Sequence, residues 1–120
     1  MNCRSIMHEL SIALSILDTA SAEAKRQHLS KITAIHLRLG PLAGVDRDAL
    51  ASAYGLAREG SDFGHCELII EETPIISHCA KCAAERTISS LEEILCPACG
   101  HPADVRSGRD LEVTAFEVEV

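Results

Sequence analysis

The chain contains no tryptophan, and only one tyrosine and two phenylalanines occur among its 120 residues. Because apolar residues still make up 47% of the sequence, the core must be built from Leu, Ile, Val and Ala. Basic residues are also scarce, with 11 Lys and Arg against 18 Asp and Glu, for a net charge of −7. Both nucleic acids and anionic membranes attract clustered basic residues, so neither is an expected partner. The shortage of aromatic side chains for base stacking also argues against nucleic acid.

Long apolar runs are missing as well, so no segment of the sequence is predicted to span a membrane. The stretch from Leu10 to Leu17 is fairly apolar, but polar residues interrupt it and no small-residue cleavage site follows, which argues against a signal peptide. We therefore expect a cytoplasmic protein. In that compartment six cysteines are expected to act as metal ligands and free thiols, and two disulfides are the alternative.

Four of the cysteines form two pairs, Cys79-Ala-Lys-Cys82 and Cys96-Pro-Ala-Cys99, separated by thirteen residues. A short β-hairpin can bring two such CxxC motifs to the corners of a tetrahedron, which is the geometry of a structural Zn²⁺ site. A segment of about thirty residues buries too little apolar surface to fold unaided, and structural zinc contributes about 10–16 kcal/mol in small finger peptides. The same four thiolates could hold iron in a rubredoxin-like redox centre. A closed four-sulfur site leaves no open position for catalysis.

Other potential ligands have weaker signals. His78 and His101 flank the cysteine motifs, either as solvated histidines or as residues that tune the metal site or serve as auxiliary ligands. Cys66 is interpreted as a small apolar residue entering a strand. His28, His36 and His65 lack metal-ligand spacing and are expected to be ordinary surface or strand residues.

Hydrophobic periodicity predicts two helices and three strands around the cysteine segment. Apolar residues at helical spacing indicate a helix over 7–28, with Leu10, Ala13, Leu14, Leu17 and Ala24 on its apolar stripe. A second helix, capped by Asp46 or Asp48, is predicted to run to about Glu59 and to stop at Gly60. Alternating patterns predict strands over 30–39, 67–71 and 110–120, and a bulge in the last one accounts for a slip of parity between Val113 and Phe116.

These elements predict an α+β protein in which two helices pack on a three-stranded sheet and a zinc ribbon is inserted between two of the strands. The main domain is then discontinuous and comprises residues 1–73 and 107–120. The zinc-ribbon domain comprises residues 74–106.

The N-terminal sequence Met7-His8-Glu9-Leu10-Ser11 places an imidazole and a carboxylate together at the predicted start of the first helix. The helix dipole and simple exposure would explain them. However, this motif is followed by Leu39-Gly40-Pro41-Leu42-Ala43-Gly44-Val45 and then by the two CxxC motifs. In that order the three elements, from Met7 to Val120, closely resemble the HypA/HybF family of hydrogenase nickel-incorporation proteins.

The resemblance implies a nickel metallochaperone, not an enzyme. It implies that Cys79, Cys82, Cys96 and Cys99 hold structural Zn(II). It also implies that His8 and Glu9 bind the transported Ni(II), with Asp46 as a further candidate ligand. The implied partners are a HypB-type GTPase and the large subunit of NiFe hydrogenase. Urease maturation proteins are a further candidate. The oligomeric state is expected to be a monomer or a weak homodimer.

The chain departs from the family at its N-terminus, where residues 1–6 precede the usual start. In a nickel chelate the α-amino group, a deprotonated amide and the imidazole of His8 would form fused rings. With residues 1–6 present, the α-amino group is not on Met7. We expect that translation starts at Met7; alternatives are that the extension is processed, or that the site uses other ligands, with Cys3 as a weak candidate. A functional alternative is a zinc-ribbon adaptor that binds proteins and transports no metal, for which His8→Ala would leave activity intact.

Overall fold

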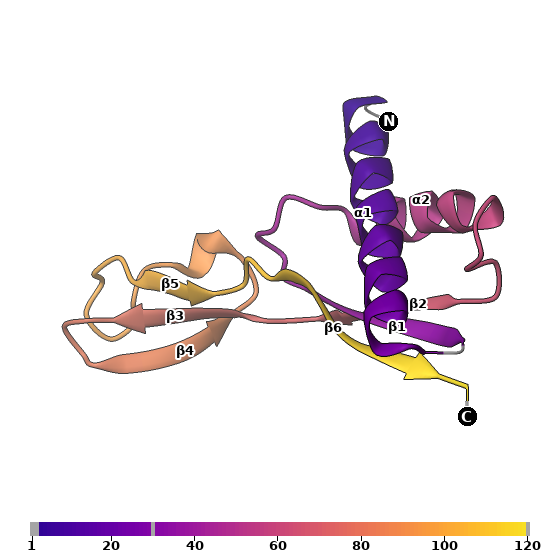
Figure 1. Cartoon of the computed structure of the whole chain (residues 1–120). Coiled ribbons are helices and arrows are strands. Elements are labelled where there is room, and N and C mark those ends of the chain that lie inside the picture. Colours follow the sequence, from indigo (N-terminus) through magenta and orange to yellow (C-terminus); the bar gives the residue numbers. More distant parts are fainter. Residues whose placement is uncertain (1–2, 30, 120) are drawn as a thin grey trace. The chain divides into compact units, whose positions relative to one another are not determined.

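The computed structural model describes residues 3–29 and 31–119, whose helices and strands Figure 1 shows in chain order. The elements are α1 (Cys3–Gln27), β1 (Ile32–Leu39), α2 (Arg47–Glu59), β2 (Glu67–Glu72), β3 (Ile75–Cys79), β4 (Ala84–Ile88), the 3-10 helix η1 (Leu91–Glu93), β5 (Asp104–Ser107) and β6 (Leu111–Val118). Two three-stranded sheets form, one beside the two long helices and one around the cysteines. This arrangement confirms the predicted α+β fold class.

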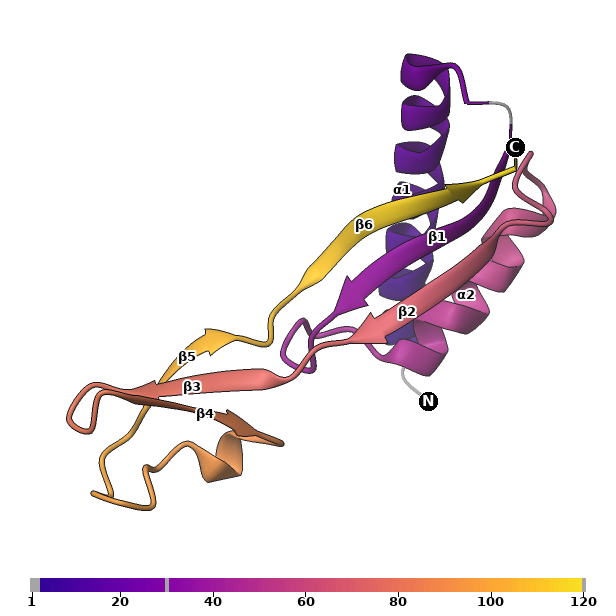
Figure 2. The same cartoon turned by 90° about the horizontal axis from the view of Figure 1, so that it is seen from below.

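The chain divides into two compact units. The first unit comprises Met1–Arg38, Val45–Glu71 and Glu112–Val120, and the second comprises Leu39–Gly44 and Glu72–Leu111. In the first unit the strand order is β2-β1-β6. Figure 2 shows β1 and β2 running in the same direction, β6 running against them, and both helices on one face of the sheet. The link from β1 through α2 to β2 is therefore the crossover that two parallel strands require.

Helix α1 packs on this sheet through Ala13, Ile16, Leu17 and Ala20, each at most 6% exposed. These positions follow the i, i+3, i+4, i+7 spacing of one helix face. The predicted stripe included Leu14, but Leu14 is 49% exposed because it lies about 100° around the helix from Ala13. The predicted helix start at Met7 is also wrong, since α1 already begins at Cys3 and its first turn contains no acidic residue.

Helix α2 begins as the sequence predicts. The side chain of Asp46 accepts a hydrogen bond of 2.8 Å from the Ala49 N–H and so caps the helix. The buried face of the helix carries Leu50, Ala53 and Tyr54, and the helix ends at Glu59 with Gly60 as its C-cap. With Ile35 and Leu37 of β1, these residues form part of an aliphatic core in which Tyr54 is the only aromatic member among the fully buried residues described.

The second unit contains the antiparallel sheet β4-β3-β5. The segment Leu39–Gly44 joins this unit through backbone bonds, because Gly40 N–H donates to Asp110 O and Leu42 N–H to Gly108 O, each at 2.8 Å. These two backbone segments approach so closely that a Cβ on Gly40 would lie 2.2 Å from the Gly108 carbonyl oxygen. Glycine is therefore required at position 40. No helix in the described part of the chain combines the length and the apolar character that a membrane span requires.

Candidate metal centres

The four paired cysteines meet at one end of the second unit. Cys79 is the last residue of β3 and Cys82 lies in the turn to β4, while Cys96 and Cys99 lie in the loop between η1 and β5. Their ligand atoms all lie within 4.8 Å of one another. The group has a buried and an open side, since Cys79 and Cys96 are each 3% exposed whereas Cys82 is exposed.

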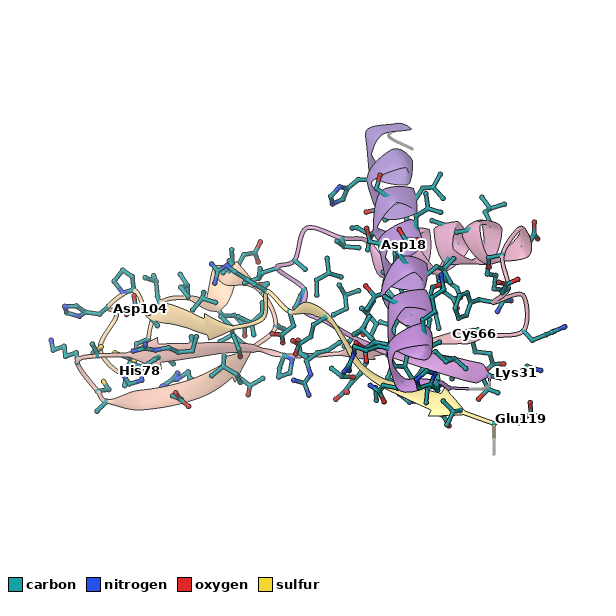
Figure 3. The ribbon with its side chains drawn as sticks, in the orientation of Figure 1. Asp18, Lys31, Cys66, His78, Asp104 and Glu119 are labelled. Carbon is teal, nitrogen blue, oxygen red and sulfur yellow. The ribbon has the colours of Figure 1, made fainter. Side chains whose placement is uncertain are left out.

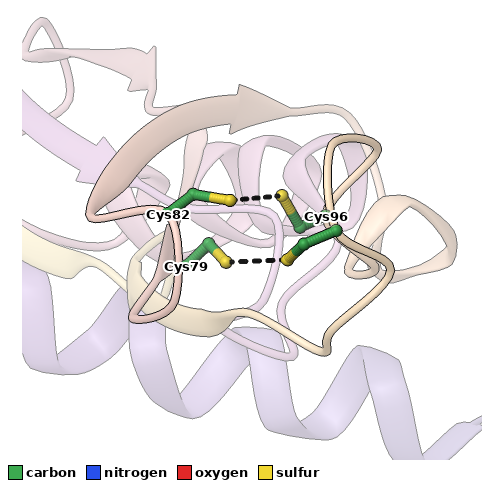
Figure 4. A group of neighbouring side chains, drawn as sticks. Cys79, Cys82 and Cys96 are labelled. Carbon is green, nitrogen blue, oxygen red and sulfur yellow. Dashed lines mark hydrogen bonds between the residues drawn. The ribbon is translucent and has the colours of Figure 1, made fainter.

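The spacing of the sulfurs fits a tetrahedral metal ion. Figure 4 shows two of the sulfur pairs, in which Cys79 Sγ lies 3.5 Å from Cys99 Sγ and Cys96 Sγ lies 3.9 Å from Cys82 Sγ. Four sulfurs bound to zinc at about 2.3 Å lie about 3.8 Å apart at the corners of a regular tetrahedron. The disulfide alternative is wrong, because all five cysteines with described side chains are free. Four converging thiolates without a cation repel one another, so the donor set suits a divalent metal.

The second knuckle stabilises a thiolate before any metal arrives. The backbone N–H groups of Cys99 and Ala98 donate to the Cys96 sulfur and lower the pKa of that thiol to about 6. Gly100 has φ +74°, and its N–H donates to the Cys96 carbonyl, which closes the tight turn expected of a knuckle. On the open side, hydrogen bonds with the sulfurs of Cys99 and then Cys96 raise the pKa of the Cys82 thiol to about 12. The surroundings thus favour the thiolate form at Cys96 and the thiol form at Cys82.

The flanking histidines take different positions. His78 lies on β3, partly buried, directly opposite Glu85 on β4 and Asp104 on β5. Figure 3 labels His78 and Asp104 beside each other on this sheet. His101 is exposed, and its carbonyl accepts the Cys96 N–H at 2.8 Å. Neither imidazole belongs to the group of converging ligand atoms, which contains only cysteines among the residues described. The role of these histidines as auxiliary ligands stays a prediction.

The predicted nickel residues divide between solvent and interior. His8 is exposed, whereas the next residue, Glu9, is only 2% exposed. Glu9 Oε1 accepts a hydrogen bond of 3.4 Å from the backbone N–H of Asp46, and the buried Oε2 has no partner. The structure therefore brings together Glu9 and Asp46 but not His8, and the three do not form a closed ligand group. A buried carboxylate oxygen without a partner is the kind of atom that an ion or a water satisfies.

The helix start changes the chelate that the sequence suggested. His8 is the sixth residue of α1, beyond the four N–H groups that a helix leaves unpaired at its start. Its amide is thus committed to the helix, and a chelate through that amide requires the first turns of α1 to unwind. The side chains of residues 3–7, including the candidate Cys3, lie outside the described part of the chain, as do Met1 and Asn2.

Cys66 has a structural role, as predicted from its sequence context. Its side chain is 1% exposed next to β2, and burial raises the pKa of its thiol. The Cys66 carbonyl accepts hydrogen bonds of 2.9 Å from both Tyr54 Oη and Arg58 Nη1. These bonds tie α2 to the start of β2.

One residue near the cysteines was not predicted to serve the site. Arg86 Nη2 lies 3.9 Å from Cys96 Sγ. Arg86 stands in an ordinary strand pattern with no motif around it, so only the pairing of β3 with β4 reveals its position.

Comparison with known proteins gives a consistent result. A family model described as hydrogenase/urease nickel incorporation, metallochaperone, hypA, matches residues 7–118. A Chloroflexus aurantiacus protein named hydrogenase maturation factor HypA is 44% identical over 112 residues, covering 92% of this chain and 98% of the relative. A Chlorobaculum tepidum protein of the same name is 38% identical over 114 residues, covering 94% of this chain and 100% of the relative.

Solved structures agree at the level of the fold. The solution structure of the Ni metallochaperone HypA from Helicobacter pylori matches with a TM-score of 0.64 at 20% identity, covering 92% of this chain and 96% of the other. Another solution structure, of a HypA protein, matches with a TM-score of 0.69 at 22% identity, covering 94% and 97% of the two chains.

Proposed function

The chain belongs to the HypA family of hydrogenase/urease nickel-incorporation metallochaperones, and from this membership we propose that it carries Ni(II) to the large subunit of NiFe hydrogenase during maturation. In this proposal the protein is a cytoplasmic carrier and not an enzyme. It acts with a HypB-type GTPase, and delivery to urease maturation proteins is a second route open to the family, whose description names both enzymes.

The observation that carries the nickel proposal is the carboxylate of Glu9. It is buried on α1 beside the N-terminus of α2, with one oxygen unpartnered, and the exposed His8 is its neighbour in sequence. In the proposed capture step, the His8 imidazole takes Ni(II) from solution, since imidazole nitrogen suits nickel. Glu9 and Asp46 then supply oxygen ligands as the start of α1 unwinds. A site completed only by this rearrangement stays open on one side, as release to an acceptor requires.

The second metal has a different duty. We propose that Cys79, Cys82, Cys96 and Cys99 hold Zn(II), which stabilises the fold of the ribbon. Support comes from the sulfur spacing and from the thiolate that the second knuckle already stabilises. The closed four-sulfur set leaves no position for cargo, so transported nickel and resident zinc occupy separate sites.

Calorimetric titration of zinc-loaded protein with Ni(II) tests the proposal. The parent is expected to bind about one nickel ion, and His8→Ala is expected to lose that binding while keeping its zinc. His65→Ala is a matched control, because His65 is also an exposed histidine of the first unit. Equal nickel binding by the parent and His8→Ala would remove His8 from the site, and the zinc-ribbon adaptor would then become the better account.

A further inference from the structure

Arg86 reaches the metal centre from a neighbouring strand. It lies on β4, is partly buried, and places Nη2 3.9 Å from Cys96 Sγ. Its backbone is held in register opposite Ser77 of β3, whose buried hydroxyl donates to the Arg86 carbonyl at 3.3 Å. Because Ser77 precedes the ligand Cys79 by two residues on the same strand, one pairing fixes both Arg86 and the first knuckle.

The guanidinium of Arg86 faces a site whose net charge is negative. Zn²⁺ bound by four thiolates carries a net charge of −2, and arginine stays protonated at all physiological pH values. Its contact is with Cys96, which is 3% exposed and also receives the N–H groups of Ala98 and Cys99. Hydrogen bonds to a coordinating sulfur withdraw electron density from it and tune the metal site. The four ligands are therefore unequal, with Cys96 held by several donors and Cys82 exposed.

We propose that Arg86 is a positioning residue of the zinc centre: its guanidinium holds the Cys96 sulfur in the ligand set and lowers its nucleophilicity. The centre then opens at the exposed Cys82, and Cys96 is the last thiolate to leave the metal. This inference rests on the proposed zinc assignment and is independent of nickel transport.

Cysteine alkylation and zinc release in the zinc-loaded full-length chain test this role. Iodoacetamide modification, followed by peptide mapping, reports the nucleophilicity of each sulfur, and a chromophoric chelator reports zinc release. Arg86→Gln removes the charge, and Arg86→Lys keeps the charge but not the planar fork. Arg106→Gln is the matched control, because Arg106 is an exposed arginine on β5 of the same sheet.

We expect Arg86→Gln to raise the alkylation rate of Cys96 about tenfold, as loss of a hydrogen bond to a charged group predicts, and to accelerate zinc release. The Cys82 rate is expected to change little, Arg86→Lys to lie between parent and Arg86→Gln, and Arg106→Gln to match the parent. The ligand-field spectrum of the Co(II)-substituted protein should keep its tetrahedral signature in all variants.

Equal alkylation rates of Cys96 in Arg86→Gln and Arg106→Gln would overturn the proposal. So would a uniform acceleration at all four cysteines with loss of the Co(II) spectrum, since that is a folding defect. Metal analysis of the parent tests the zinc assignment separately.

Discussion

Glu9 on α1 accepts, through Oε1, the backbone N–H of Asp46, the residue that caps α2. The bond joins the two helices at the point where the unpaired N–H groups of α2 carry partial positive charge. Such a position stabilises a carboxylate, yet Oε2 of the same group is buried without a partner. One oxygen of Glu9 therefore has a structural role, and the other is available to bind a cation.

Glu9→Gln should separate these two uses. The amide keeps an oxygen that can accept the Asp46 N–H. The substitution removes a buried charge, but it also removes the attraction of that charge to the N-terminus of α2. We therefore expect the free energy of unfolding to change by no more than about 1 kcal/mol. Nickel affinity is expected to fall at least about tenfold, because a carboxylate ligand is lost. Thermal unfolding and Ni(II) titration measure the two effects. Glu23→Gln is the control, since Glu23 lies on the same helix and its carboxylate accepts hydrogen bonds from Arg26 and Gln27, away from α2. A parent-like nickel affinity in Glu9→Gln would remove Glu9 from the ligand set.

Asp46 allows a similar separation. Asp46→Ala deletes the cap to the Ala49 N–H and should destabilise the protein by about 1 kcal/mol. Asp46→Asn keeps a good capping oxygen and should retain near-parent stability, but it should weaken nickel binding if the carboxylate is a ligand. Chemical denaturation and nickel titration of both variants give the answer. Full nickel affinity in Asp46→Asn would confine Asp46 to its capping role.

The Cys96 thiol gives the zinc centre a defined dependence on pH. Its pKa is lowered from 9.0 to about 6 in the folded protein, so the thiolate form stabilises the metal-free fold above pH 9, and this stabilisation is lost as pH falls through 6. Zinc binding must displace the Cys96 proton below this pKa but not above it. The number of protons released on zinc binding should therefore fall by nearly one between about pH 5 and pH 7.5. Calorimetry in buffers of different ionisation enthalpy measures this number. Cys96→Ser should lack the step, and its persistence in that variant would assign the titration to another group.

Removal of zinc tests the proposed domain division. Without metal, the backbone N–H groups of residues 74–106 should exchange faster than in the zinc-loaded protein, because the ribbon has little core beyond the cysteine cluster and loses the stabilisation that the metal supplies. The first unit has its own aliphatic core and should keep its protection, most clearly at Ile35 and Leu37. Simultaneous loss of protection in both units would show that the chain folds as one cooperative domain.

Glycine substitutions give a purely steric prediction. Gly40→Ala would place a Cβ 2.2 Å from the Gly108 carbonyl oxygen, a backbone atom with little room to move. We expect a destabilisation of at least about 2 kcal/mol. Gly55→Ala, in the middle of α2 with no atom within 4 Å of the new Cβ, should stabilise the protein by up to about 1 kcal/mol. Urea denaturation of the two variants compares them directly. A neutral Gly40→Ala would mean that Leu39–Gly44 is not held as closely to Gly108 as described.

The elements that the sequence predicts well are those with a local physical cause. The cap at Asp46, the aliphatic face of α2 and the convergence of the four cysteines all follow from neighbouring residues or from ligand spacing. The start of α1 and the exposure of Leu14 were not predicted. The length of a helix and the face that it buries depend on what the helix packs against. The apolar residues of α1 are compatible with more than one buried face.

Long-range relations were beyond prediction from the sequence. The burial of Glu9 beside Asp46 requires the crossing of α1 and α2, and adjacent residues on a helix face different directions, so His8 could not be assigned the same environment. Arg86 reaches Cys96 only through the register of β3 with β4. The spacing of residues along the chain predicts neither the burial of Glu9 nor the contact of Arg86 with Cys96.

X-ray absorption at the nickel edge of protein loaded with both zinc and nickel tests the central claim most directly. If transported nickel and resident zinc occupy separate sites, the nickel should have nitrogen and oxygen ligands with an imidazole contribution that disappears in His8→Ala. The zinc edge should show four sulfur ligands in both proteins. Sulfur scattering at the nickel edge would contradict this account, because it would place the nickel on the cysteines.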